Sequence, residues 1–199
     1  MAAIRRNRPA EVELPSLTGE WTTYADRRQR FVEVLEAVGG TAIIAPNHAA
    51  LDAELRRLPI YSQAHNIASL VPDVGQSNID LSSINAPHAL DNVDVAILPG
   101  EFAVAENAAI WVTDRDVPLR VLYFLCQHLV LVVPAGAILD HLHAAYEQIS
   151  AKNHGKAAAF AEPMFGAFIS GPSKTADIEQ SLVIGAHGPR SLTVCLLEN

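Results

Sequence analysis

The spacing of apolar residues predicts two helices and one strand in the first third of the chain. A helix is predicted over Tyr24–Val38 and ends at Gly39-Gly40, a strand follows over Thr41–Ala45, and Asn47 caps a second helix that Pro59 ends. This alternation of helix, strand and helix predicts an α/β fold with a mostly parallel sheet flanked by helices. The apolar stripes are Phe31, Val34, Leu35 and Val38 in the first helix, which Thr22 or Thr23 would cap, and Leu51, Leu55 and Leu58 in the second.

Strands and helices continue to alternate through the rest of the chain. Residues 1–20 are predicted to be an N-terminal arm, because Pro9, Pro15 and Gly19 interrupt any regular element, and residues 21–199 one α/β domain. Residues 72–92 are rich in Pro, Gly, Ser, Asn and Asp and are predicted to be loop. The remaining predicted elements are an extended segment Ile67–Val71, a strand Val93–Leu98, a hairpin of Phe102–Ala105 and Ala109–Val112, a helical turn from Asp114, a strand Leu129–Val133, a helix Gly136–Ile149 and a strand Leu192–Leu197.

The stretch from Phe165 to Arg190 has the densest polar chemistry. The apolar run Phe165–Ile169 has the length and composition of a buried strand, and it stops at the turn signal Ser170-Gly171-Pro172. Five polar side chains follow within seven residues, which is a poor composition for a core. Open α/β sheets bind ligands at the carboxyl ends of their strands, so we expect this loop at that edge. These polar residues are Ser173, Lys174, Thr175, Asp177 and Glu179.

An anion site is one hypothesis for this loop. If Thr175 opens a short helix, the free N–H groups of its first turn and the nearby Lys174 favour a phosphate or a carboxylate. The alternative is that Ser173 or Thr175 only caps a helix and that Asp177 complements its dipole.

Three acidic residues and one histidine are further candidates. Asp177 and Glu179 are candidates for general acid or base, although solvated charge is the commoner role of such residues. Glu106 lies between the two hairpin strands and is either an exposed turn residue or a carboxylate at the ligand edge. His187, in the sequence Gly-Ala-His-Gly-Pro, lies in a loop that could fold beside Ser173, although a turn histidine is the commoner case.

Composition excludes several classes of function. The chain has 199 residues, a net charge of −8 and a pI near 5.4, so nucleic acid is not an expected partner. Cys126 and Cys195 lie in apolar runs, which indicates buried free thiols and a cytoplasmic protein, and two cysteines cannot hold an iron–sulfur cluster unaided. No metal site is predicted, because neither C-x-x-C nor H-E-x-x-H occurs. The apolar run Val121–Val133 is too short to span a membrane, and no signal peptide is apparent.

The residues of this stretch also resemble a known family. Gly171–Gln180 (GPSKTADIEQ), followed by GAHGP at residues 185–189, closely resembles the signature of the LUD domain family. The similarity extends with less specificity to Arg30–Gly40, to Val93–Val112 and to Arg5–Pro9, so that it covers most of the chain. One departure is at residues 105–109, AENAA, where the family pattern resembles AETGT and a glycine would let a backbone approach a ligand.

The resemblance implies a fold, a role and a site. The fold would be a single α/β sandwich like that of glucosamine-6-phosphate isomerases, ribose-5-phosphate isomerases and CoA transferases, which bind phosphosugars or CoA esters at the loop edge. The role would be L-lactate oxidation to pyruvate in a complex with two iron–sulfur proteins, with no cofactor bound by this chain. The alternatives are a stand-alone enzyme for a phosphosugar or CoA ester, and a non-catalytic docking subunit. The implied site comprises Asp177, Glu179 and Glu106 as catalytic candidates and Gly171, Pro172, Ser173, Lys174, Thr175 and His187 as ligand-binding candidates.

Overall fold

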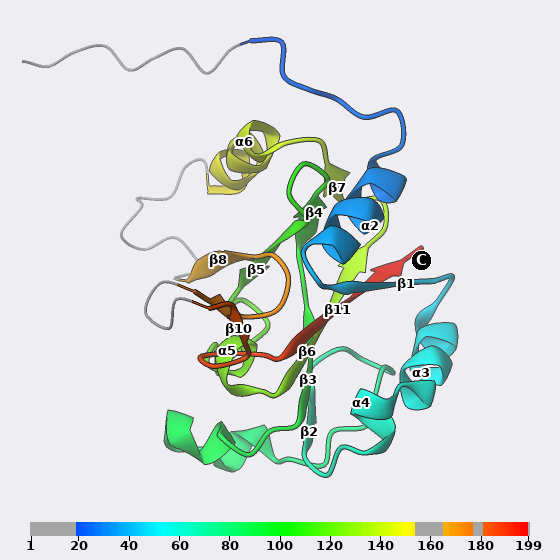
Figure 1. The fold of residues 1–199 in the computed structure, drawn as a ribbon. Helices are drawn as coiled ribbons and strands as arrows, with labels where there is room; N and C mark the ends of the chain where they lie inside the picture. The colour runs from blue at the N-terminus through cyan, green and yellow to red at the C-terminus, as the bar shows by residue number, and fades with distance from the viewer. Residues whose placement is uncertain (1–18, 154–164, 177–180, 199) are drawn as a thin grey trace, which may run out of the picture.

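The computed structural model describes residues 19–153, 165–176 and 181–198, which form three β-sheets, five α-helices and two 3₁₀ helices (Figure 1). The helices are α2 Arg27–Ala37, α3 His48–Arg57, α4 Pro59–Ser62, α5 Leu122–Leu125 and α6 Leu142–Asn153, with short 3₁₀ helices η1 Leu81–Ser83 and η2 Pro87–Leu90. The strands are β1 Thr41–Ala45, β2 Ile67–Ser69, β3 Val95–Pro99, β4 Phe102–Val104, β5 Ala109–Thr113, β6 His128–Pro134, β7 Ile138–Leu139, β8 Gly166–Ile169, β9 Lys174–Thr175, β10 Val183–Ile184 and β11 Ser191–Leu197.

The larger sheet has five parallel strands in the order β1-β11-β6-β3-β2. Its central strands β3, β6 and β11 are almost entirely buried, as expected for a parallel sheet that is covered on both faces. Alternate side chains of each strand therefore join different cores. The predicted α/β fold with a mostly parallel sheet flanked by helices is confirmed.

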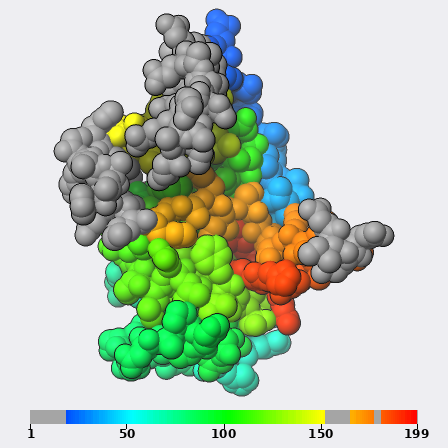
Figure 2. Space-filling model, turned by 90° about the vertical axis from the view of Figure 1, so that its left-hand side faces the viewer, coloured from blue at the N-terminus to red at the C-terminus, as the bar shows by residue number. Residues whose placement is uncertain are grey.

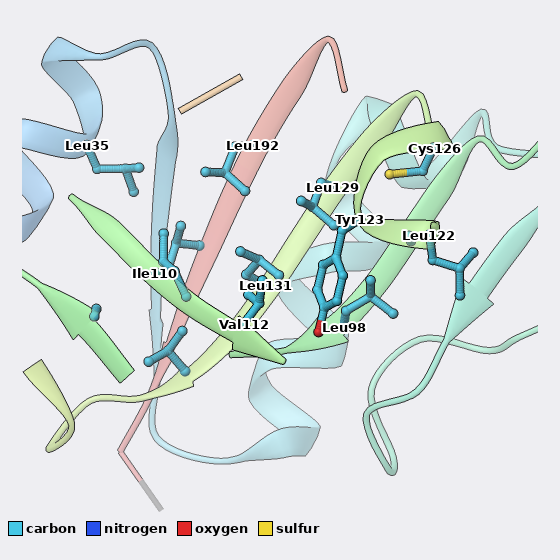
Figure 3. Packing of buried hydrophobic residues seen from close by; sticks show 14 of the residues in the cluster. Leu35, Leu98, Ile110, Val112, Leu122, Tyr123, Cys126, Leu129, Leu131 and Leu192 are labelled. Carbon is cyan, nitrogen blue, oxygen red and sulfur yellow. The ribbon is translucent and has the colours of Figure 1, made fainter. Parts of the chain in front are cut away.

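Helices and the second sheet cover the two faces of the parallel sheet (Figure 1). On one face, α3 and α4 pack through Leu51, Leu55 and Tyr61. On the other face lie α2 and a four-stranded sheet of order β7-β4-β5-β8, whose outer face is covered by α6. Figure 3 shows Leu98, Leu129 and Leu131 of the parallel sheet facing side chains of the second sheet and α5.

Most element boundaries of the first third agree with the sequence predictions. Strand β1 has the predicted bounds, and Asn47 caps α3 by accepting the N–H of Ala50 at 2.9 Å. Helix α2 begins later than predicted, because Asp26 rather than Thr22 or Thr23 is its cap; the Asp26 carboxylate accepts the N–H of Gln29 at 2.9 Å.

Three elements differ from the predictions for tertiary reasons. The predicted helix Gly136–Ile149 was wrong at its start, because Ile138–Leu139 pairs with β4 as strand β7 and the helix begins at Leu142. The helical turn expected from Asp114 occurs instead at α5. The apolar run at Phe165–Ile169 is not a buried strand: β8 is a half-buried edge strand, antiparallel to β5, in the second sheet.

Candidate functional site

The loops that follow β8 and precede β11 are joined by backbone hydrogen bonds. The N–H of Ser173 donates to the carbonyl of Pro189 at 2.9 Å, and the N–H of Gly185 donates to the carbonyl of Ser173 at 2.9 Å. Gly188 lies so close to Ser173 that a Cβ on it would be 3.0 Å from the Ser173 Cβ. The prediction that the His187 loop folds beside the Ser173 loop is therefore confirmed.

A cavity of about 240 Å³ opens between these loops and the two sheets. Its wall is mainly apolar, and the polar side chains at it are Ser170, Ser173 and His187. Figure 2 shows the surface of this region, where orange atoms of residues 165–176 lie beside red-orange atoms of residues 181–190. A mainly apolar pocket with a few polar groups is the usual form of a small-molecule site. The apolar lining comprises Tyr123, Phe124, Leu129, Phe168, Ile169 and Leu192.

The structure places this cavity at the opposite edge of the sheet from the one predicted. Leu129 and Leu192 are each the second residue of their strands, and Pro189 precedes β11, so the cavity lies at the amino ends of β6 and β11. The prediction of the carboxyl edge was wrong because it assumed that β8 belonged to the parallel sheet. Since β8 lies in the second sheet, its following loop reaches the start of the parallel strands instead.

Lys174 and Thr175 are in a strand rather than at a helix start. They form β9, which pairs with β10 in an antiparallel ribbon, so the premise of the predicted helix N-terminus was wrong. The Lys174 ammonium donates to the carbonyl of Val38 at 2.5 Å, just after α2, where a cation complements the negative end of the helix dipole. The Ser173 N–H is also occupied, as described above. Ligand binding by Ser173, Lys174 and Thr175 stays a prediction, but the free N–H groups of a helix start cannot be the groups that bind the ligand.

Gly171 and Pro172 pack this loop against the end of α2. Gly171 has φ +70°, a left-handed conformation that glycine adopts without strain. A Cβ at this position would lie 2.8 Å from the carbonyl oxygen of Val38, and Pro172 packs against Gly39. Both residues also line the cavity, so these contacts fix the position of its rim.

Glu106 lies outside the cavity. Its carboxylate accepts the backbone N–H of Leu142 at 3.0 Å, at the start of α6, where a negative charge complements the helix dipole. The same turn is connected to the cavity rim, because the Ser170 hydroxyl donates to the carbonyl of Asn107 at 2.7 Å. In the same turn, Ala108 has φ +53° and is fully buried, so an alanine adopts a left-handed conformation at the position where the resemblance led us to expect glycine.

Asp177 and Glu179 lie outside the described residues, so their predicted roles stay predictions.

The sequence interpretation missed two side chains that organise this region. Tyr123 is buried, and its hydroxyl lies 3.1 Å from the carbonyl of Thr113 and 3.3 Å from that of Pro99, which end β5 and β3 (Figure 3). Tyr123 therefore ties the two sheets together beneath the cavity, and burial raises the pKa of its hydroxyl far above the usual value. A tyrosine inside the apolar run Val121–Val133 was the available signal.

Asp140 is the second missed residue and holds the segment before α2. It is 6% exposed, accepts the N–H of Tyr24 at 3.0 Å and forms a salt bridge with Arg27 at 2.6 Å. Burial alone would raise the pKa of Asp140, but the Arg27 and Tyr24 hydrogen bonds outweigh it and hold the pKa below its usual value. Asp140 was missed because it lies within the predicted helix over residues 136–149, where an aspartate is usually solvent-exposed.

The cysteines are placed on opposite sides of the parallel sheet. Cys126 packs in the core with α2 and the second sheet, whereas Cys195 packs in the core with α3, and both are free thiols. Within the described ranges, no three His, Cys, Asp or Glu side chains are grouped in a way that could hold a metal ion. The described helices include none that is both long and apolar enough to cross a membrane.

These features define a class of α/β protein with a parallel sheet, a smaller second sheet and a loop-lined cavity between them. The chain belongs to the LUD domain family, whose model matches residues 60–197. A solved structure of a DUF162 family protein from Deinococcus radiodurans has the same fold, with a TM-score of 0.62 over 86% of this chain and 96% of that one, at 16% identity.

Curated relatives carry one recurrent name. Lactate utilization protein C of Geobacillus kaustophilus is 28% identical in an alignment 178 positions long, which covers 84% of this chain and 67% of that protein. Lactate utilization protein C of Geobacillus thermodenitrificans is 30% identical over 116 residues, which are 58% of this chain and 44% of that protein. This chain therefore matches less than half of the length of one relative, 44%, and about two thirds of the length of the other, 67%.

Proposed function

We propose that this chain takes part in the use of L-lactate, as a subunit of a cytoplasmic system that oxidises L-lactate to pyruvate together with iron–sulfur partner proteins. The observation that carries the proposal is the similarity to lactate utilization protein C of Geobacillus kaustophilus over 84% of the chain. Membership of the LUD domain family supports it.

The positions of the cysteines support iron–sulfur clusters in partners rather than in this chain. Oxidation of lactate to pyruvate releases two electrons, which need an acceptor. Iron–sulfur clusters are generally held by four cysteine thiolates, whereas Cys126 and Cys195 lie in separate cores of this chain. Burial raises the pKa of each thiol to about 12, which disfavours the thiolate that a cluster requires.

We propose that the cavity at the Ser173 and His187 loops is the working site of this subunit. Its apolar wall suits the carbon skeleton of a small ligand, and Ser170, Ser173 and His187 supply hydrogen-bonding groups. Gly171 and Pro172 would shape the rim, while Asp177 or Glu179 would orient the ligand or take a proton. Glu106 would act indirectly, through the turn that holds Ser170.

Growth on L-lactate tests the role and the site together. A strain that lacks the gene should fail to grow on L-lactate, and the wild-type gene should restore growth. The variants Ser173→Ala and His187→Ala should restore it poorly, while Ser62→Ala, an exposed serine outside the cavity, should restore it fully. Normal growth of the deletion strain, with no second copy of the gene, would refute the role. Full rescue by both cavity variants would refute the site.

A docking subunit is the second candidate function, and exposed apolar side chains favour it. Phe124 is 43% exposed and lines a hollow with residues 185–188, and Leu182 and Ile184 nearby in sequence are 62% and 51% exposed. Solvent-exposed apolar groups that gather on one surface often mark a protein interface. If partners dock here, Phe124→Ser and Ile184→Ser should lose them in a pull-down, whereas Tyr146→Ser, at an aromatic residue on α6 that is 61% exposed, should keep them. Retention of partners by all three variants would remove this candidate.

A further inference from the structure

A second hollow, of about 660 Å³, opens at the amino edge of the parallel sheet. Three neighbouring strands, β11, β6 and β3, begin here, and each contributes a side chain at or just before its first residue: Arg190, His128 and Asp94. The register pairs His128 with Ser191 and Val95, so Arg190 and Asp94 each lie one residue before a partner of His128. Since β6 lies between β11 and β3, the imidazole lies between a guanidinium and a carboxylate along this edge of the sheet. Backbone hydrogen bonds fix the starts of these strands relative to one another: the N–H of Arg190 donates to the carbonyl of Gln127 at 2.8 Å, and the N–H of His128 donates to the carbonyl of Asp94 at 2.8 Å.

The Arg190 guanidinium is available for a ligand. Arg190 is exposed at the hollow and forms no salt bridge with any residue that the structure describes. Its stem lies against Gly185, where an added Cβ would be 2.4 Å from the Arg190 Cγ, so the side chain is held at this position. A planar guanidinium binds a carboxylate in a bidentate manner, which gives both affinity and orientation.

His128 is a neutral hydrogen-bonding group beside this cation. Its Nδ1 lies 2.8 Å from the Ser191 hydroxyl, so the other ring nitrogen remains for the hollow. Burial and the charge of Arg190 lower the pKa of His128, against a smaller opposite effect of Asp94. A neutral imidazole can accept a hydrogen bond from a hydroxyl or donate one to a carbonyl oxygen, depending on its tautomer.

The remaining walls select the charge and the size of a ligand. Asp91 and Asp94 also line the hollow, so it carries two carboxylates against one guanidinium. The two carboxylates repel a doubly charged phosphate more strongly than a singly charged anion, so among anions the lining favours a monoanion whose charge rests on Arg190. One Asp94 oxygen already accepts the N–H groups of His65 and Asn66, at 2.8 and 2.9 Å. The apolar part of a ligand can lie against Pro59, Ile60 and Ala64.

We infer that this hollow binds a short 2-hydroxy or 2-oxo monocarboxylate, with its carboxylate on Arg190 and its 2-oxygen on His128. The inference rests on the proposed function for the choice among monoanions, since L-lactate and pyruvate are the simplest members of the class. It places the acid at the amino edge of β11, β6 and β3, in a hollow separate from the cavity at Ser173. The two sites are neighbours because His187, Gly188 and Pro189, which line the cavity, belong to the loop that ends at Arg190, which lines the hollow.

Titration of the full chain with L-lactate and with pyruvate, followed by ligand-observed NMR, tests the inference. Both acids should bind. Propionate, which lacks the 2-oxygen, and lactamide, which lacks the carboxylate, should bind more weakly. Arg190→Gln should weaken binding about tenfold or more, because it removes charge-assisted hydrogen bonds, and Arg190→Lys should weaken it less. Arg115→Gln, an exposed arginine outside the hollow, is the matched control and should bind as the wild type does.

Two results would overturn the inference. One is that neither acid binds the wild-type chain; the other is that Arg190→Gln binds both as well as Arg115→Gln does. A urea unfolding curve for each variant separates lost binding from lost folding. The growth assay is independent of these titrations. If neither acid binds but the deletion strain fails to grow on L-lactate, the proposed binding site is refuted and the proposed role stands. If the acids bind but the deletion strain grows normally, the proposed role is refuted and the binding site stands.

Discussion

Replacing Gly171 by alanine should destabilise the protein strongly, although it adds only one methyl group. At φ +70° an L-residue pays about 1–2 kcal/mol in left-handed backbone strain. The new Cβ would also lie 2.8 Å from the Val38 carbonyl oxygen and 3.2 Å from a Val38 methyl group, and such overpacking costs about 1–3 kcal/mol. The lower entropy of the unfolded alanine chain offsets about 0.4–1 kcal/mol of this. The expected net loss is therefore about 2–4 kcal/mol.

Urea unfolding of the wild type and of two glycine variants would measure this loss. Gly136→Ala is the matched control, because a Cβ at that exposed glycine would meet no atom within 4 Å and the backbone is not left-handed. We expect Gly136→Ala to change the free energy of unfolding by no more than about 0.5 kcal/mol. Gly171→Ala should lower the melting temperature by about 4–16 °C, at about 2–4 °C per kcal/mol for a chain of this size. Equal stability of the two variants would refute the close approach of the Gly171 loop to the end of α2.

Three further predictions follow from buried polar groups. Tyr123→Phe should lower the free energy of unfolding in urea by about 1–3 kcal/mol, because it leaves buried carbonyls without their donor. The control Tyr146→Phe, at a residue 61% exposed, should lower it by less than about 0.5 kcal/mol. Equal losses would contradict the hydrogen bond between the sheets. Cys126 and Cys195, whose pKa burial raises to about 12, should react with a thiol reagent at pH 8 only after unfolding, and rapid labelling of the folded protein would contradict their burial. The pKa of Asp140 is held below its unfolded value of about 3.9, so its ionised form stabilises the fold above that pH and this contribution is lost as the pH falls. Urea curves at pH 7 and pH 3 should therefore show a larger loss for the wild type than for Asp140→Asn, and identical losses would refute the argument.

The fold class followed from the sequence because it depends on local pattern. The apolar stripe of α2, the asparagine cap of α3 and the turn between β4 and β5 are encoded by neighbouring residues, and all three are present. Two cysteines in apolar runs were likewise sufficient to predict buried thiols. The stretch at residues 171–189 that resembles the LUD domain family is also continuous, and the match of the family model to residues 60–197 confirms that family.

The errors arose where pairing with a distant strand decides the structure. Ile138 and Leu139 fit a helical stripe, yet they pair with β4 because that edge of the second sheet was free to accept a strand. Likewise Phe165–Ile169 is apolar enough for a buried strand, but it lies at the edge of the second sheet. Local composition carries no information on strand order, so the sequence could not decide to which sheet each segment belongs.

The position of the candidate site depended on that strand order. The sequence by itself determined an α/β fold, a polar loop after Ile169 and a second loop around His187, since each follows from composition over a few residues. Only the tertiary structure decided that these loops meet at the amino ends of β6 and β11, and that Arg190, His128 and Asp94 line one hollow. The physical reason is that parallel strands bring together residues separated by more than thirty positions in the chain, and only the register of their hydrogen bonds sets which side chains become neighbours.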